Sequence, residues 1–347
     1  MAEMADWQII GQKNVAAFLA KSLEKGVLCH AYLLTAPEHS GKTALALKLA
    51  QALNCTGDNS PCGGCESCRR ITAGIHADVR LISVQAADED GKNRVELSIE
   101  QVREINHAVS LPPFEGKFRV IIIDEAERLS TGAANALLKT LEEPPPGVVF
   151  ILTTVRENQL PETIRSRCMK LRLAAAPRRE IVRFLEHGLG FPAERADLLA
   201  RLSQGRAGWA ITAARDEGLQ LERRDNLLKL TDALGSGFDF RFELADKLSQ
   251  RFGKTRTEIY RLLDQWLSFC RDILLVKLDI KEEVINTDYE IITAELASRI
   301  TAAEAQRLIG SLNATRRHLE QNASPRLALE VLMLNLPVIK GSTNRIG

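Results

Sequence analysis

Short apolar runs alternate with helix-like segments along the first half of the chain. Runs rich in branched apolar residues predict five strands, at residues 31–35, 79–84, 118–124, 148–154 and 169–173. Apolar residues at helical spacing predict helices between them, at residues 14–25, 43–54, 99–110 and 131–143. Strands that are apolar throughout and separated by helices are typical of a parallel sheet buried between helices. The pattern therefore predicts an α/β domain that ends near residue 173.

The second half of the chain follows a different pattern, because apolar residues recur there at helical spacing and no strand is indicated. A helical segment at residues 177–217 is followed by a break at Gly235-Ser236-Gly237, and helical spacing continues from residue 240 to residue 336. We expect a small helical domain at residues 174–218 and a larger all-α domain at residues 219–347.

The composition is that of a globular protein, with 347 residues of which 45% are hydrophobic and 26% are charged. The 46 basic and 45 acidic side chains leave a net charge of +1, which excludes a strongly basic protein that coats nucleic acid by charge alone. No stretch approaches the roughly 18–20 apolar residues of a membrane helix. Residues 1–7 carry no basic segment followed by an apolar run. We expect a cytoplasmic protein without a signal peptide or a membrane partner.

A phosphate-binding motif follows the first predicted strand. Residues 36–43, APEHSGKT, fit the pattern GxxxxGK[ST] except that Ala36 replaces the first glycine. In such a loop backbone N–H groups face an anion, the lysine neutralises the β- and γ-phosphates, and the threonine hydroxyl ligates Mg²⁺. The motif predicts that ATP with Mg²⁺ is held by Ser40, Gly41, Lys42 and Thr43. A vestigial loop is the alternative, since a Cβ at position 36 would cost about 1–2 kcal/mol if that position needed a positive φ.

Two carboxylates end the third predicted strand, where Asp124 and Glu125 follow an apolar run. We expect Asp124, which would also belong to the nucleotide site, to hold Mg²⁺ through water, and Glu125 to polarise the attacking water. Thr153 and Thr154 end the next strand, where a hydroxyl is suited to position that water or to contact the γ-phosphate, and we assign this role to Thr154. The alternative is an acidic helix N-terminus, which favours carboxylates without any nucleotide.

Four cysteines, Cys55, Cys62, Cys65 and Cys68, have the spacing CxxxxxxCxxCxxC. In a reducing compartment clustered cysteines indicate metal ligands before disulfides. Four thiolates suit tetrahedral Zn²⁺ with no position left open for a substrate, and the two glycines between the second and third cysteines allow a tight turn. The spacing predicts a structural zinc module at residues 55–68. Four free thiols or two disulfides are the alternatives.

The triplet Ser166-Arg167-Cys168 precedes the last predicted strand. The residues alone favour a surface salt bridge or a helix C-cap for Arg167. The alternative is an arginine finger, which stabilises the charge of a nucleotide bound to a neighbouring subunit and therefore needs an oligomer.

Several motifs occur in one order along the chain: GKT at 41–43, the four-cysteine insert, IDEAERL at 123–129, ALLKTLEEPP at 136–145 and SRC at 166–168. Together they resemble the bacterial sliding-clamp-loader subunits of the AAA+ class. The resemblance returns at residues 322–330, NASPRLALE, which are similar to the family's collar helix. It implies three domains. Residues 1–173 would form an AAA+ P-loop domain into which the zinc module is inserted, residues 174–218 a helical lid, and residues 219–347 a collar that joins homologous subunits.

The family contains motor subunits, gamma and tau, that hydrolyse ATP, and a delta-prime subunit that is commonly described as a rigid stator lending its SRC arginine to the adjacent motor. The chain resembles the delta-prime type in its degenerate phosphate loop and in residues 131–135 and 162–168. Gly208 stands where a motor carries a second arginine in the lid, with Arg206 close by. The retained lysine, threonine and carboxylates of the nucleotide site point instead toward a motor.

The resemblance implies a delta-prime-type subunit of the DNA polymerase III complex, in which Arg167 completes a neighbour's ATP site and the chain's own ATPase is weak or absent. Implied partners are gamma/tau-type and delta subunits and, through the complex, the sliding clamp and primed DNA. Two rivals stay open. One is an ATP-hydrolysing gamma/tau-type motor, and the other is a zinc-dependent nucleic-acid or protein-binding module on an inactive ATPase scaffold. The even charge balance argues against tight autonomous DNA binding.

Overall fold

The computed structural model describes residues 7–84 and 96–339, and the chain divides into two compact units. Unit 1 comprises Met1–Leu189 and Ser203–Ala210, and unit 2 comprises Gly190–Leu202 and Ile211–Gly347. The expected domain boundaries at residues 173 and 218 stay predictions. Residues 1–6, on which the expectation about a signal peptide depends, lie outside the described residues.

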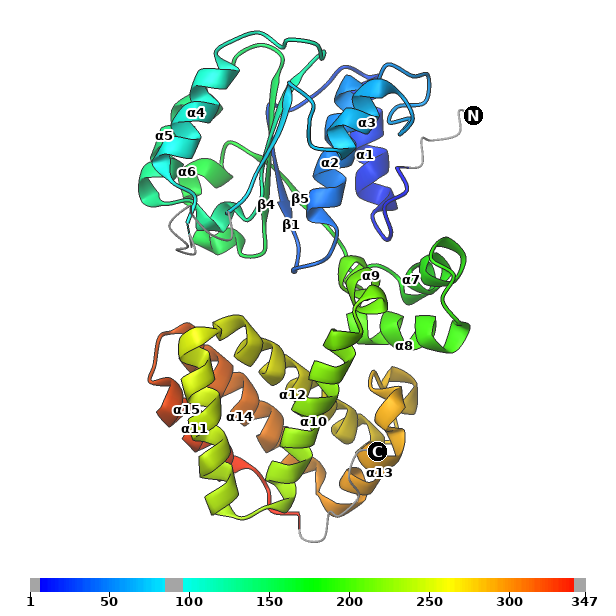
Figure 1. The fold of residues 1–347 in the computed structure, drawn as a ribbon, viewed down its shortest axis with the longest axis vertical. Coiled ribbons are helices and arrows are strands. Elements are labelled where there is room, and N and C mark those ends of the chain that lie inside the picture. Colours follow the sequence, from blue (N-terminus) through cyan, green and yellow to red (C-terminus); the bar gives the residue numbers. More distant parts are fainter. Residues whose placement is uncertain (1–6, 85–95, 340–347) are drawn as a thin grey trace. The chain divides into compact units, whose positions relative to one another are not determined.

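Unit 1 contains a five-stranded parallel sheet with the strand order β2-β3-β4-β1-β5 (Figure 1). The strands are β1 (Ala31–Thr35), β2 (Val79–Ile82), β3 (Arg119–Ile123), β4 (Val148–Thr154) and β5 (Met169–Arg172). All five predicted strands are confirmed. The structure gives β1 and β4 the bounds that the sequence predicts, whereas the other three strands are shorter than predicted by one or two residues.

Helices cover both faces of this sheet, as Figure 1 shows. Successive strand residues point to opposite faces, so Tyr32 and Leu34 of β1 pack against α1 and α2, while Leu33 packs with α4 and α5 on the other face. The helices assigned to this unit are α1 (Lys13–Glu24), α2 (Lys42–Asn54), α3 (Glu66–Thr72), α4 (Ile99–Val109), α5 (Thr131–Glu142), α6 (Glu162–Arg165) and α7 (Arg178–Arg183). The short helices α3 and α6 were not predicted, since each is too brief to show a helical period.

A buried carboxylate fixes the loop that leads into β3. Asp78 is fully buried and accepts hydrogen bonds from the backbone N–H groups of Phe114, Glu115 and Gly116, each at 2.8 Å. It also pairs with the guanidinium of Arg119 at 2.8 Å. Burial alone would raise the pKa of Asp78, but these donors lower it from 3.8 to about 2. Asp78 therefore stabilises the fold as a carboxylate.

We expect Asp78→Asn to lower the free energy of unfolding by about 3 kcal/mol, because it removes the buried partner of Arg119. Urea unfolding at pH 7 measures this, with the exposed Glu104→Gln on α4 as a control that should change stability by less than about 0.5 kcal/mol. Since the folded-state pKa lies below 3.8, the stabilisation is complete above about pH 4 and is lost as the pH falls toward 2. Equal stability of Asp78→Asn and the wild type would contradict this role.

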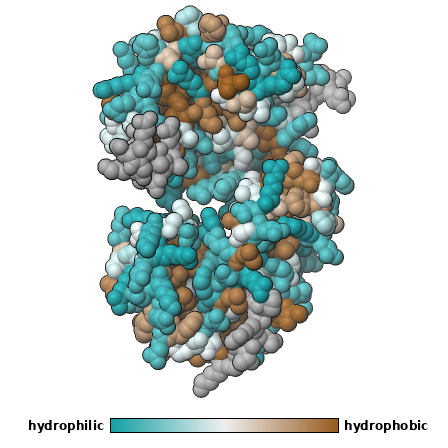
Figure 2. All heavy atoms as spheres, viewed as in Figure 1, coloured by the Kyte–Doolittle hydropathy of each residue, from teal (hydrophilic) through white to brown (hydrophobic). Residues whose placement is uncertain are grey.

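Unit 2 contains no strand among its described residues, which confirms the all-α expectation. Trp266 and Phe269 of α12 are buried in its core, surrounded by apolar residues of the other helices. The helices are α10 (Glu217–Gly235), α11 (Phe238–Lys254), α12 (Arg256–Lys277), α13 (Glu290–Arg299), α14 (Ala302–Glu320) and α15 (Pro325–Asn335); α8 (Ala193–Ser203) and α9 (Ala207–Arg215) include residues of both units. On the face that Figure 2 shows, apolar side chains form patches among polar ones in both units.

A buried arginine joins two helix ends in unit 2. The guanidinium of Arg241, which is fully buried, donates to the carbonyl oxygens of Ala233, Leu336 and Pro337, each at 2.7 Å. These carbonyls lie at the C-terminal ends of α10 and α15, where helices leave acceptors without an internal partner. Arg241 therefore compensates its buried charge by satisfying the ends of two helices at once.

Candidate functional site

The phosphate loop connects β1 to α2. Gly41 is the N-cap of α2 with a left-handed φ of +88°, and no side chain caps this helix N-terminus. Ser40 is buried in the loop, and His39 is also left-handed, with φ +59°. Ala36 lies outside the left-handed region, so its Cβ introduces none of the strain that a positive φ would bring. The uncapped N-terminus of α2 is suited to an anion.

Lys42, the first residue of α2, turns back onto the loop. Its ammonium group is buried and donates to the carbonyl oxygens of Ala36 at 3.0 Å and Pro37 at 2.9 Å. Burial lowers the pKa of Lys42, and the nearby carboxylate of Asp124 opposes that shift. A phosphate would give Lys42 a charged acceptor in exchange for the two neutral carbonyls.

Asp124 brings three elements together at the carboxyl end of the sheet. The hydroxyl of Thr43, on α2, donates to Oδ1 of Asp124 at 3.0 Å. The hydroxyl of Thr153, at the end of β4, donates to the same oxygen at 2.5 Å. Carboxylate and hydroxyl oxygens are ligands that Mg²⁺ prefers, so this group is chemically suited to Mg²⁺ beside the phosphate loop. The structure thus places Thr43 and Asp124 together, as the sequence led us to expect.

Glu125 and Thr154 are engaged elsewhere. Glu125 has a left-handed φ of +51° and forms an ion pair with Arg128 at 2.9 Å. Burial raises the pKa of Glu125, and Arg128 opposes the shift. The buried hydroxyl of Thr154 accepts from the backbone N–H of Arg156 at 3.1 Å. Thr153 rather than Thr154 contacts Asp124, because successive residues of a strand point to opposite faces.

A backbone hydrogen bond joins the first turn of α9 to the phosphate loop. The N–H of Gly208 donates to the carbonyl oxygen of His39 at 2.8 Å. A Cβ on Gly208 would lie 2.8 Å from that oxygen, too close for any side chain. An arginine at this position would therefore require the loop to move. Neither the pairing of Glu125 with Arg128 nor this contact was found from the sequence.

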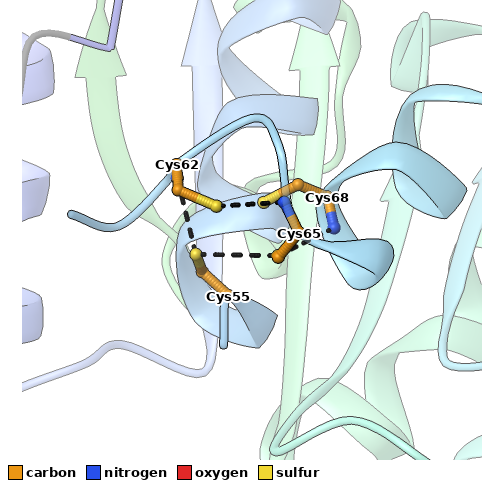
Figure 3. A group of neighbouring side chains, drawn as sticks. All are labelled: Cys55, Cys62, Cys65 and Cys68. Carbon is orange, nitrogen blue, oxygen red and sulfur yellow. Dashed lines mark hydrogen bonds between the residues drawn. The ribbon is translucent and has the colours of Figure 1, made fainter. Parts of the chain in front are cut away.

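The four cysteines converge between the end of α2 and α3, with their side chains turned toward one another (Figure 3). All four Sγ atoms lie within 4.8 Å of one another, and none of the four is in a disulfide. Cys55 and Cys65 are 3.9 Å apart at their Sγ atoms. A tetrahedral zinc ion with Zn–S bonds of about 2.3 Å separates its sulfurs by about 3.8 Å. The donor set and its spacing fit zinc.

Backbone N–H groups support negative charge on these sulfurs. Cys55 Sγ accepts from the N–H of Gly57 and of Cys62, and Cys65 Sγ accepts from the N–H of Cys68, each at 3.4 Å. Burial alone would raise the pKa of the Cys65 thiol, but backbone donors at Thr56 and Cys68 bring it to about 5. The thiolate is the form that binds a metal. A Cys₄ site of this kind would have a structural role, since it leaves no ligand position open.

Arg167 follows α6 and lies at the surface with 34% of its side chain exposed. Its Nη2 forms an ion pair with Oε1 of Glu142 at 2.6 Å, and its Nη1 donates to the carbonyl oxygen of Thr163 at 2.9 Å. The isolated chain thus shows the surface salt bridge that the residues alone favoured; Arg167 also donates to a carbonyl of α6, although the C-cap residue of that helix is Ser166. Neither uses the whole guanidinium, which carries five N–H donors.

Within residues 7–84 and 96–339, every helix is too short or too polar to span a lipid bilayer.

The parallel sheet, the phosphate loop after β1 and the acidic end of β3 are those of a P-loop protein, and comparison with known families gives the particular family. The family model described as "DNA polymerase III, delta subunit" matches residues 11–177, and that described as "DNA polymerase III, delta subunit, C terminal" matches residues 248–337. The chain belongs to the bacterial DNA polymerase III clamp-loader subunits of the AAA+ family.

Individual relatives agree with this assignment. DNA polymerase III subunit tau of Escherichia coli is 40% identical over 204 residues, covering 57% of this chain and 30% of the relative. Subunit gamma of Buchnera aphidicola subsp. Schizaphis graminum is 34% identical over 236 residues, covering 66% of this chain and 62% of the relative. The chain therefore spans between about a third and under two thirds of the length of these relatives.

Two solved structures from Thermotoga maritima align with much of this chain at low identity. A DNA polymerase III gamma subunit-related protein has a TM-score of 0.43 and 20% identity, covering 91% of this chain and 97% of its own. The RuvB Holliday junction branch migration motor has a TM-score of 0.41 and 22% identity, covering 73% of this chain and 78% of its own.

Proposed function

We propose that the chain is a delta-prime-type stator of the DNA polymerase III clamp loader, which supplies Arg167 as an arginine finger to the ATP site of a neighbouring subunit. The observation that carries the proposal is the placement of Arg167, a guanidinium held at the surface of unit 1 with donors to spare. A planar, permanently charged fork is suited to the phosphates of a partner's nucleotide.

The chain's own nucleotide site supports binding of ATP with Mg²⁺ more than turnover. Ser40, Gly41, Lys42, Thr43 and Asp124 would hold the nucleotide, and the contact between Thr43 and Asp124 places hydroxyl and carboxylate beside the loop. Glu125 and Thr154 would serve hydrolysis, yet Glu125 is paired with Arg128 and Thr154 with the backbone of Arg156. These pairings favour slow hydrolysis by this chain.

We expect Lys42→Ala to weaken binding of a fluorescent ATP analogue with Mg²⁺ by at least about 10-fold, because a charged contact to phosphate is lost. Lys48→Ala, on the same helix, is the matched control and should bind like the wild type. Thermal unfolding of both variants checks that the loop without its lysine still folds. Equal affinity of Lys42→Ala and the wild type would show that the loop does not bind phosphate.

The proposal includes three domains with their expected bounds: an AAA+ domain at residues 1–173 with zinc held by the four cysteines, a lid at residues 174–218 and a collar at residues 219–347. Support for a collar comes from α15, where Leu327, Val331, Leu334 and, just after the helix, Val338 are each more than half exposed. Their spacing puts the three helical residues on one face. Such an apolar stripe is typical of a surface that packs against other subunits.

The expected partners are gamma/tau-type and delta subunits, with the sliding clamp and primed DNA engaged through the complex, in the cytoplasm. Reconstitution with those subunits tests the assignment by native mass spectrometry and ATPase assay. The proposal requires that the chain enters the complex and hydrolyses little ATP by itself. Absence from the complex would contradict it.

The gamma/tau motor is the second candidate, favoured by the intact grouping of Lys42, Thr43 and Asp124 and by the identity with tau. Robust ATPase by the isolated chain, abolished in Lys42→Ala, would establish the motor instead of the stator.

A further inference from the structure

We propose that Glu142 is a positioning residue for Arg167, which sets the orientation of the guanidinium before a neighbouring subunit is engaged. The inference rests on the proposed function of Arg167 as an arginine finger. Its basis is the ion pair of 2.6 Å between Nη2 of Arg167 and Oε1 of Glu142, across 25 residues of sequence. Glu142 is half exposed, so the pair forms at the surface and not in the core.

The position of Glu142 is unfavourable for its own helix. Glu142 is the last residue of α5, and a negative charge at a helix C-terminus is repelled by the partial charge of the free carbonyl groups. Glu143 follows it and adds a second carboxylate at the same end. A carboxylate at position 142 therefore does not stabilise the helix, whereas it gives the guanidinium of Arg167 a charged partner.

Two contacts from different helices define the guanidinium plane. Thr163, in α6, accepts from Nη1 at 2.9 Å, and Glu142, in α5, accepts from Nη2 at 2.6 Å. The carbonyl oxygen of Thr163 belongs to the backbone of α6 and is fixed by that helix. Glu142 supplies the only side-chain carboxylate contact of Arg167 within the described residues. A free arginine at a surface samples many rotamers, and a preorganised one loses less of that conformational freedom when it binds.

The expected consequence is kinetic. We expect Glu142→Ala, in the complex reconstituted with gamma/tau-type and delta subunits, to lower the kcat of ATP hydrolysis by about 10-fold, because the finger is less often in position. The KM for ATP should stay within about twofold, since the binding of ATP to the neighbour is unchanged. Glu142→Gln keeps an acceptor oxygen and should recover part of the activity. Glu143→Ala, the adjacent carboxylate without an ion pair to Arg167, is the matched control and should equal the wild type.

A double-mutant cycle separates a positioning role from a general structural one. If Glu142 acts through Arg167, Glu142→Ala should add no further loss in an Arg167→Ala background. Full additivity, or wild-type kcat in Glu142→Ala while Arg167→Ala is crippled, would overturn the inference and leave the proposed function intact. Wild-type turnover in Arg167→Ala would instead reject the proposed function, and the inference with it.

Discussion

Replacing Arg167 with alanine should reduce ATP turnover by the assembled clamp loader about 10³–10⁵-fold at the site that it completes, the range known for arginine fingers. The guanidinium would stabilise charge that develops on the transferred phosphoryl group, and alanine offers nothing in its place. The chain itself should still fold and assemble, because Arg167 is a third exposed and its ion pair with Glu142 lies at the surface.

Two control variants test whether the effect depends on the shape of the guanidinium and on the position of the arginine. Arg167→Lys keeps the charge but not the planar fork, and we expect it to remain strongly impaired. Arg172→Ala removes another exposed arginine of unit 1 and should leave turnover unchanged. Steady-state ATPase of the complex, with assembly verified by gel filtration, measures all three variants. Unchanged turnover in Arg167→Ala would exclude the finger role.

The second large effect that we expect is the loss of bound zinc when one of the four cysteines is replaced. The purified chain should carry about one zinc ion, and Cys65→Ser should lose it together with several kcal/mol of local stability, since metal binding and folding of such a module are coupled. The region affected would be residues 55–68 and α3, whose N-cap is Cys65 and whose turn includes Cys68. Elemental analysis and hydrogen exchange of this region measure the two effects.

Cys29→Ser provides the matched control, because Cys29 is half-buried, lies outside the group and contacts Met169 instead. It should retain full zinc. A wild-type chain without metal, in which mass spectrometry finds two disulfides among the four cysteines, would contradict the zinc module.

Much of the fold follows from local pattern. The bounds of β1 and β4 agree with the prediction, and the cysteine spacing predicts a group that the structure brings together. The short helices α3 and α6 were not predicted because each is too brief to show a helical period. The strand order of the sheet is set by packing between segments far apart in sequence.

The candidate site was predictable in its residue types but not in all its contacts. Thr153 and Thr154 are equivalent as sequence, and only the direction of the β4 backbone decides which hydroxyl meets Asp124. The contact between Gly208 and His39 and the pair of Glu142 with Arg167 join residues that no periodicity links. Such tertiary contacts need the folded chain, whereas the family itself could be identified from ordered motifs.

Loading of the sliding clamp onto primed DNA tests the central claim most directly. The complex would be assembled from gamma/tau-type and delta subunits with and without this chain, and clamp transfer would be followed by fluorescence. The account predicts that loading is lost without the chain, is restored by the wild type, and is not restored by Arg167→Ala. Full loading by a complex that lacks the chain would contradict the account.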